Sequence, residues 1–224
     1  MLSKHLRVTF LVALLSTYAL QARAGASLFV DDATLTPAGR CQVESWARTY
    51  TPGQELTAVP ACTVDGTEWS LGVSQLHNAS SSTLLGPGIK RVFRDFDTHD
   101  WGVGLSVGTA WNVTRGHLDG WNVNVPMTFA LDSQRRVVMN TNVGWAQSPG
   151  KHGAVTGGIG FEVAIAGHWA MLAEAYRDTH AAGEAGIRRY LSEDASFDVL
   201  VGADRGQTHS AWVTVGFNIV LPKE

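Results

Sequence analysis

The chain has 224 residues, of which 45% are hydrophobic and 17% charged, and its formal net charge at pH 7 is −3. This composition excludes an intrinsically disordered chain, which would be poor in apolar residues, and a strongly basic nucleic-acid-binding protein. One folded domain is the simplest expectation for this length.

Residues 1–24, MLSKHLRVTFLVALLSTYALQARA, are typical of a cleaved secretory signal peptide. They contain a basic start at Lys4 and Arg7, an apolar run over 8–20, and small residues at Ala22 and Ala24. The alternative, a membrane anchor, needs about 20 apolar residues, which is more than this run supplies. Cleavage removes three of the 17 basic residues and leaves 14 against 20 acidic ones, a net charge of −6, so we expect no nucleic-acid partner.

The two cysteines of the chain, Cys41 and Cys62, both follow the signal peptide. An even number of cysteines in an exported protein favours a disulfide over a metal site or a catalytic thiol. The alternative is two independent buried thiols. We predict a bridge that pins the first connection between strands, including TPGQELTAVPA, and that contributes about 3 kcal/mol by chain-entropy reasoning.

After a short leading segment, 25–40, the sequence divides into strand-like runs separated by clusters of Gly, Pro, Asn, Asp and Ser. Only HWAMLAEAYRD offers a helical alternative, since it is rich in good helix formers. In chain order, the eleven runs span residues 41–50, 67–76, 83–93, 101–113, 120–131, 135–146, 153–165, 168–177, 182–191, 196–203 and 209–221.

Several runs alternate with a period of two, which places successive side chains on opposite faces of a sheet. In RVVMNTNVGWAQ, Val137, Met139, Val143 and Trp145 alternate with a face that includes two asparagines. A soluble sandwich or lipocalin-like barrel would bury the apolar face, whereas an outer-membrane barrel would turn it toward lipid.

The residue types favour the outer-membrane barrel. The polar faces consist mainly of Gly, Ala, Ser, Thr and Asn, whereas a water-facing exterior would carry abundant Lys and Glu. Runs of about ten residues also match tilted membrane-spanning strands. The eight tryptophans lie mostly near the ends of the runs, where interfacial aromatic girdles form, although ordinary sheet packing is the alternative for any single one.

The predicted fold is therefore all-β, an antiparallel up-and-down transmembrane barrel of 10–12 strands over residues 41–224. Bacterial barrels use even strand numbers, so we predict 12. Since eleven runs are marked, either the leading segment 25–40 supplies one more strand or two of the runs form one long bent strand.

Six stretches over residues 28–221 carry a resemblance to a known family: LFVDDATLTPAGRCQVE, GPGIKRVF, MNTNVGW, AMLAEAY, AGIRRYL and WVTVGFNIVL. Together they resemble the outer-membrane barrel proteins grouped with the meta-pathway of phenol degradation, which are described as transporter-like. The resemblance implies passage of small hydrophobic or aromatic molecules across the outer membrane. The chain departs from this family in its cysteine pair and in ending on PKE instead of an aromatic residue.

If the apolar faces meet lipid, a set of polar and charged side chains points into the lumen. Such groups form either a structural ion-pair network, since unpaired charge in a confined site is costly, or a constriction that selects solutes. The set is Glu44, Arg48, Arg136, Asn140, Asn142, Glu162, Glu174, Glu184, Arg188, Asp198 and Asn218.

The histidines are scattered and show no metal-binding or nucleophile-elbow spacing, so we predict no enzyme, no catalytic residue, no metal and no cofactor. The expected function is passage of small molecules across the outer membrane of a Gram-negative bacterium, as a monomer whose partners are outer-membrane lipid and a small hydrophobic solute. The alternative is a structural or adhesion barrel, without transport, whose lumen is plugged by its own side chains.

Overall fold

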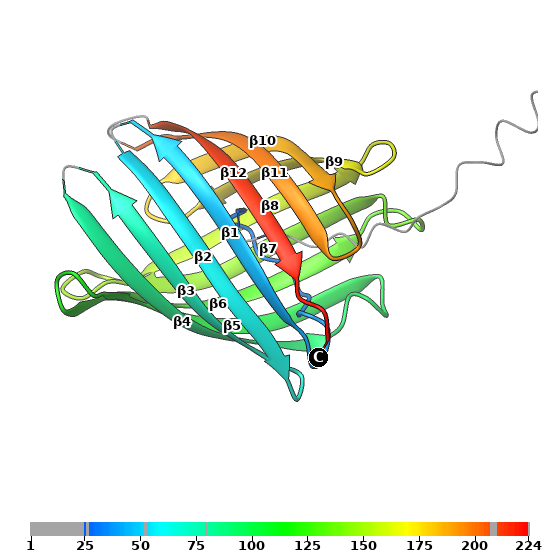
Figure 1. Ribbon diagram of the computed structural model, residues 1–224, viewed down its shortest axis with the longest axis horizontal. Coiled ribbons are helices and arrows are strands. Elements are labelled where there is room, and N and C mark those ends of the chain that lie inside the picture. The colour runs from blue at the N-terminus through cyan, green and yellow to red at the C-terminus, as the bar shows by residue number, and fades with distance from the viewer. Residues whose placement is uncertain (1–24, 26, 52, 79, 207–209, 224) are drawn as a thin grey trace, which may run out of the picture.

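The computed structural model describes residue 25 and residues 27–51, 53–78, 80–206 and 210–223 (Figure 1). These parts of the chain form a closed barrel of twelve antiparallel strands, in which each strand pairs with the next and β12 pairs with β1. The predicted all-β barrel of 12 strands is confirmed, whereas the expected signal peptide 1–24 lies outside the described residues. The strands are β1 (Cys41–Tyr50), β2 (Gly53–Val64), β3 (Thr67–His77), β4 (Ser81–Arg94), β5 (Trp101–Asn112), β6 (His117–Ala130), β7 (Val137–Gln147), β8 (Ala154–Ala164), β9 (Trp169–Arg177), β10 (Ala181–Tyr190), β11 (Ala195–Asp204) and β12 (Ala211–Val220).

The period-two pattern sets which side chains face the lumen. In β7, Asn140 and Asn142 are buried, whereas Val143 is 57% exposed on the outside of the barrel. The run with a helical alternative forms β9, because its alternation continues the pairing with β8 and β10. Among the described residues, no helix is long and apolar enough to cross a membrane.

The twelfth strand is β2, and neither alternative expected for the strand number was right. The described residues of the leading segment form no strand, and no two marked runs form one long strand. The stretch GQELTAVPACTV, expected to be a connection, pairs with β1 along its whole length. Its proline hides the pattern, because Pro60 has no N–H to donate, and the ladder to β3 is interrupted at Val59 and Pro60.

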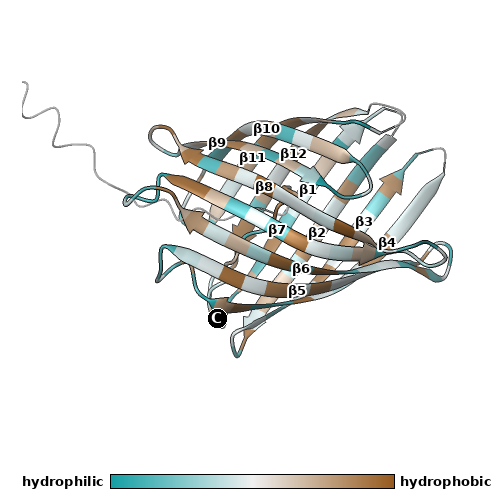
Figure 2. Cartoon of the chain, turned by 180° about the vertical axis from the view of Figure 1, so that it is seen from behind, coloured by the Kyte–Doolittle hydropathy of each residue, from teal (hydrophilic) through white to brown (hydrophobic). Residues whose placement is uncertain are grey.

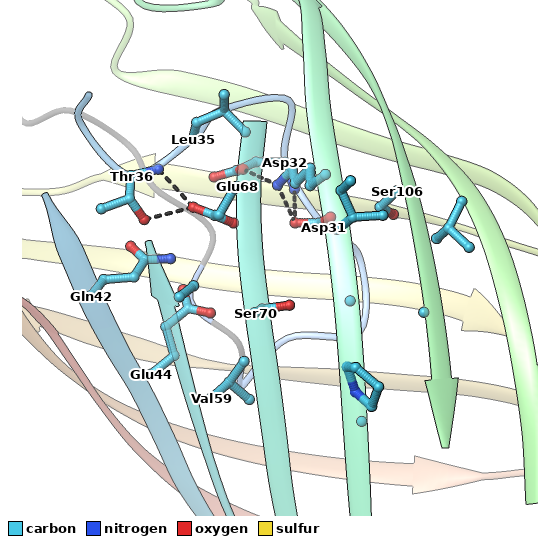
Figure 3. Close-up of a pocket in the computed structure, with 18 of the residues that line it drawn as sticks. Asp31, Asp32, Leu35, Thr36, Gln42, Glu44, Val59, Glu68, Ser70 and Ser106 are labelled. Carbon is cyan, nitrogen blue, oxygen red and sulfur yellow. Dashed lines mark hydrogen bonds and ion pairs between the residues drawn. The ribbon is translucent and has the colours of Figure 1, made fainter. Parts of the chain in front are cut away.

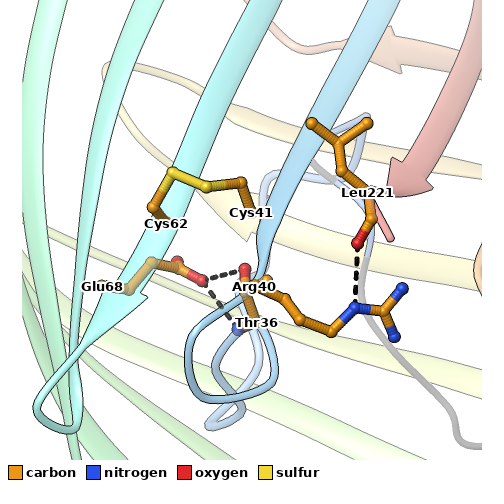
Figure 4. The surroundings of a disulfide bond; sticks show 6 residues. All are labelled: Thr36, Arg40, Cys41, Cys62, Glu68 and Leu221. Carbon is orange, nitrogen blue, oxygen red and sulfur yellow. Dashed lines mark hydrogen bonds between the residues drawn. A yellow bond between two sulfur atoms is a disulfide. The ribbon is translucent and has the colours of Figure 1, made fainter. Parts of the chain in front are cut away.

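The Cys41–Cys62 disulfide is confirmed, but its position differs from the prediction (Figure 4). The two cysteines are directly opposed partners of β1 and β2, with Cα atoms 4.0 Å apart. The bridge therefore ties together the open end of a β-hairpin and does not pin a loop. Next to it, the Thr63 N–H donates to the Arg40 carbonyl at 3.2 Å, and the Gly39 N–H donates to the Thr63 carbonyl at 3.1 Å.

We call the end of the barrel where β1 begins and β12 ends the proximal end, and the opposite end the distal end. At the proximal end the Arg40 guanidinium donates to both carboxylate oxygens of Asp194 at 2.9 Å and to the Leu221 carbonyl at 2.9 Å. The hydrogen bonds to Asp194 raise the pKa of Arg40 above its ordinary value. These contacts fix the chain where it enters β1.

The exterior of the barrel is apolar. Figure 2 shows hydrophobic residues recurring along the strands and hydrophilic residues gathered in the connections. Six tryptophans are exposed on this surface. They belong to the proximal half of their strands (Trp69, Trp101, Trp169) or to the distal half (Trp111, Trp121, Trp145).

Candidate functional site

Residues 27–36 of the leading segment lie inside the barrel, and we call them the inner segment. Figure 1 shows its blue trace within the ring of strands. Ser27 and Ala33 are fully buried, and Val30 is 1% exposed. The lumen of this barrel is therefore occupied by a stretch of its own chain, which the sequence patterns did not predict.

One wall of the lumen holds the inner segment by its backbone. The Glu174 carboxylate on β9 accepts hydrogen bonds from the N–H groups of Phe29 at 2.8 Å and Val30 at 2.9 Å. The Ser27 hydroxyl donates to Asp198 on β11 at 2.7 Å. The Phe29 ring stacks on Tyr176 with centroids 4.2 Å apart. This side of the lumen binds residues 27–30.

The opposite wall holds the middle of the segment. Lys90 on β4 places its Nζ 2.9 Å from Asp31 and 3.2 Å from Asp32. Asn142 on β7, in the amide orientation that matches donors with acceptors, donates to the Asp31 carbonyl and accepts from the Asp31 N–H, both at 2.9 Å. The segment therefore crosses the lumen between the two walls.

The last part of the segment returns to the proximal end. The Ala33 N–H donates to the Thr128 hydroxyl on β6 at 2.8 Å. The Thr36 N–H and hydroxyl both donate to one oxygen of Glu68 on β3, at 2.8 Å and 2.6 Å (Figure 3). Wall carboxylates and hydroxyls thus satisfy backbone donors that would otherwise be buried without partners.

The side of the lumen formed by β8–β12 is closed by ion pairs. Arg188, 1% exposed, donates to both oxygens of Asp198 at 2.7 Å and 2.8 Å and to Glu162 at 3.0 Å. The Tyr190 hydroxyl donates to the other oxygen of Glu162. A bidentate, hydrogen-bonded arrangement of this kind compensates buried charges well. This part matches the structural ion-pair network that the sequence left as one alternative.

A second group continues this network toward the distal end. The Trp212 indole on β12 donates to Glu184 on β10 at 2.7 Å, and Arg48 lies 3.9 Å from the same carboxylate. Arg48 also donates to the Thr214 hydroxyl at 3.0 Å and to the Ser27 carbonyl at 3.3 Å. The seam between β1 and β12 is thereby linked to the inner segment.

The side formed by β1–β6 contains open space. A cavity of about 440 Å³, which we call the proximal cavity, lies between the inner segment and these strands. Figure 3 shows Glu44, Glu68 and Asp31 around it. Together with Asp32 they give four carboxylates against the single ammonium of Lys90 among the described lining residues.

A second cavity of about 470 Å³, the distal cavity, is lined by β5–β8 and by distal connections that include Lys151, His152 and Asp178. Its lining is mixed: polar side chains that include Asn124 and Asn142 lie beside apolar ones, and Phe29 of the inner segment adds an aromatic ring. Ser106 and Asn122 line both cavities. The two cavities therefore adjoin at β5 and β6, and the distal cavity reaches the distal connections.

The structure places most of the expected lumen residues on the inward face. Those in β7–β11 are buried, and Glu44, Arg48 and Asn218 are partly exposed within the barrel. Arg136 differs from the prediction, because it lies in the connection before β7 and is exposed. The turn in which the Arg135 N–H donates to the Asp132 carbonyl delays the start of β7 by one residue.

The sequence patterns did not predict the two acidic residues of the segment, Asp31 and Asp32. They also did not predict four wall residues that contact the segment: Glu68, Lys90, Thr128 and Tyr176. A signal existed for two of them, since Glu68 and Lys90 are opposed partners of β3 and β4 and share the inward face. Within the described residues, no group of three His, Cys, Asp or Glu side chains is arranged to hold a metal ion.

Comparison with known proteins gives a family match over nearly the whole chain. Residues 10–221 match the profile of the family described as "Uncharacterised conserved protein UCP029691". No curated protein matches the sequence.

Solved structures share the fold at very low sequence identity. A structure of the KdgM porin matches with a TM-score of 0.64 and 8% identity, covering 81% of this chain and 99% of that one. The NanC porin matches with a TM-score of 0.62 and 8% identity, covering 81% and 100%. The outer membrane protein Omp33 of Acinetobacter baumannii matches with a TM-score of 0.53 and 7% identity, covering 81% and 98%. These likenesses show a porin-like barrel fold.

Proposed function

The chain belongs to the family described as "Uncharacterised conserved protein UCP029691", and from its porin-like fold we propose that it is an outer-membrane barrel that lets small solutes cross. The proposal includes export by cleavage after residue 24 and function as a monomer. The observation that carries it is the pair of adjoining cavities beside the inner segment, both of which are lined by many polar side chains.

The exterior supports a place in a lipid bilayer. Val143, Val155 and Met171 are each more than half exposed on the outside, and water would meet them there in a soluble protein. Contact with lipid removes the free-energy cost of exposing these apolar side chains to water. The six outward tryptophans, divided between the proximal and distal halves of the strands, fit the two interfacial girdles of outer-membrane barrels.

The lining of the path favours small polar solutes. Carboxylates, amides, hydroxyls and glycines dominate both cavities, and the excess of carboxylates around the proximal cavity attracts cations and repels anions. The passage of hydrophobic or aromatic molecules implied by the resemblance has one supporting feature, the Phe29 ring, which is 36% exposed within the lumen. The link to phenol degradation stays a prediction.

Planar-bilayer recording on the purified mature barrel tests this proposal. We expect small single-channel conductance steps in KCl and a reversal potential that favours K⁺ over Cl⁻ in a salt gradient. Boiled protein, which loses the faster gel migration of a folded barrel, is the control. Folded barrel that gives no steps in bilayers, and no swelling of liposomes in small neutral sugars, would contradict the proposal.

The second candidate is a barrel without transport, with a structural or adhesive role. The dense hydrogen bonding of the inner segment to β3, β6, β9 and β11 favours it, since these contacts fill much of the lumen. Outer-membrane fractionation without conductance would support this candidate. That the chain is no enzyme stays a prediction, and a lipid-hydrolysis assay on the same preparation tests it.

A further inference from the structure

The barrel wall is shaped to receive the inner segment. A barrel of about eight strands is filled by its own side chains, and the enclosed space grows with strand number, so twelve strands leave room for more. At Gly158 an added Cβ would lie 2.7 Å from Val30, and at Gly216 it would lie 2.9 Å from Ser27. Both distances are too short for a side chain, so these wall positions accommodate the segment only as glycine.

The wall grips mainly the backbone of the segment. Glu174, Thr128 and Glu68 accept N–H groups of residues 29, 30, 33 and 36, which lie on three separate parts of the segment. These contacts are independent of the segment's own side chains. These wall residues therefore hold the backbone of the segment in one conformation across the lumen.

Lys90 holds the middle of the segment at the side of the lumen formed by β1–β6, which we call the open side; Glu68 and Thr128 hold the last part of the segment there. Residues 27–30 are held at β9 and β11, whereas Lys90 reaches from β4 to Asp31 and Asp32. Lys90 and both aspartates line the proximal cavity. The ion pair thus places the segment beside the space through which solutes are proposed to pass.

We propose, on the basis of the proposed function, that the inner segment sets the upper size of the solutes that pass through the lumen. Lys90 is the positioning residue that holds the segment where the solute path is narrowest. The wall alone encloses a wider lumen. Solutes larger than the space between the segment and β1–β6 are excluded by the protein's own N-terminal stretch.

The first experiment removes residues 27–35 and leaves Thr36–Arg40, with its proximal contacts, in place. We expect a severalfold rise in single-channel conductance and passage of larger neutral polyethylene glycols in liposome swelling. Heat-modifiable gel migration confirms that the shortened barrel folds. Unchanged conductance and an unchanged polymer limit in a folded barrel would overturn the inference and leave the proposed function standing.

Two further results separate the inference from the proposed function. If the deletion variant conducts and the complete mature chain does not, the inference holds and passage through the resting protein is contradicted. If folded barrel conducts neither with nor without residues 27–35, then the proposed function fails and the inference fails with it.

The second experiment leaves the inner segment intact and replaces Lys90, which forms the ion pairs with Asp31 and Asp32. Lys90→Met should raise the conductance and the polymer limit to values between those of the wild type and the deletion variant. Exchange of the charges in Lys90→Asp with Asp31→Lys should restore part of the narrowing. Arg91→Met is the matched control, because Arg91 is the neighbouring base on β4 but is exposed on the outer face. Equal effects of Lys90→Met and Arg91→Met would overturn the role of Lys90.

Discussion

The closed side of the lumen, formed by β8–β12, and the open side, formed by β1–β6, both contain ion pairs, but the pairs have different roles. On the closed side, Arg188 joins Asp198 of β11 and Glu162 of β8, so both partners belong to the wall. On the open side, Lys90 joins Asp31 and Asp32, which belong to the inner segment, and Asp31 is 38% exposed. A wall-to-wall pair closes space, whereas a wall-to-segment pair positions a separate part of the chain beside a cavity. The two basic residues therefore differ in the location of their carboxylate partners, which is the wall for Arg188 and the inner segment for Lys90.

The largest expected effect breaks the closed side. Arg188→Met leaves Asp198 and Glu162 as buried carboxylates without their cation, and we expect a loss of about 3–5 kcal/mol in the free energy of unfolding. Urea unfolding in micelles, followed by tryptophan fluorescence, measures it. Adding Asp198→Asn and Glu162→Gln should recover part of the loss, and no recovery would show that packing, not charge, dominates there.

The open side lacks such a network, and the disulfide braces it instead. Replacement of both Cys41 and Cys62 by serine should lower the stability by about 3 kcal/mol, since the bridge closes a stretch with a sequence separation of 21. Reduction of the wild type should have the same effect in the same assay, while reductant should leave the double variant unchanged. A double variant as stable as the wild type would show that the disulfide does not brace the open side.

A smaller effect is expected at the wall-to-segment pair. Lys90→Met should cost on the order of 1 kcal/mol, because the Lys90 and Asp31 side chains remain partly in contact with water. The same unfolding assay measures this cost. A loss as large as that of Arg188→Met would show that the segment is as integral to stability as the closed wall.

The smallest effect on stability is expected for a substitution that tests whether the open side selects ions by charge. Glu44→Gln changes a carboxylate that lines the proximal cavity to an amide of similar shape, so unfolding should be unaffected. In alkaline buffer, in which the lumen carboxyl groups are ionised, the reversal potential in a KCl gradient should shift toward zero, because one attracting charge is lost from the path. Glu162→Gln on the closed side is the control and should leave the reversal potential unchanged.

Much of the barrel could be predicted because a strand between lipid and a lumen must alternate. Val143 and Asn142 show this rule directly, with one outside and one inside. β2 was missed where the rule is locally broken, since Pro60 interrupts the ladder and Gln54 and Glu55 read as a polar connection.

The inner segment could not be predicted from alternation, because it is held by contacts that leave no periodic trace. Glu174 was expected in the lumen as a charge, but its partners are the backbone N–H groups of Phe29 and Val30, which any residue carries. Sequence patterns report which face a side chain takes. Such patterns do not predict which backbone segment an inward-facing side chain will contact.

The contacts of the inner segment also imply an order of folding. Ser27 and Asp198 are 171 residues apart in the sequence, and Phe29 and Glu174 are 145 apart, whereas Cys41 and Cys62 belong to one hairpin. Local pairings form early, and contacts of long sequence separation form late. The disulfide can therefore form on an isolated hairpin, but the segment has no seat until β11 is in place. We therefore expect a newly assembled barrel to pass through a stage in which the inner segment is not yet bound in the lumen, with the binding of this segment among the last steps of maturation.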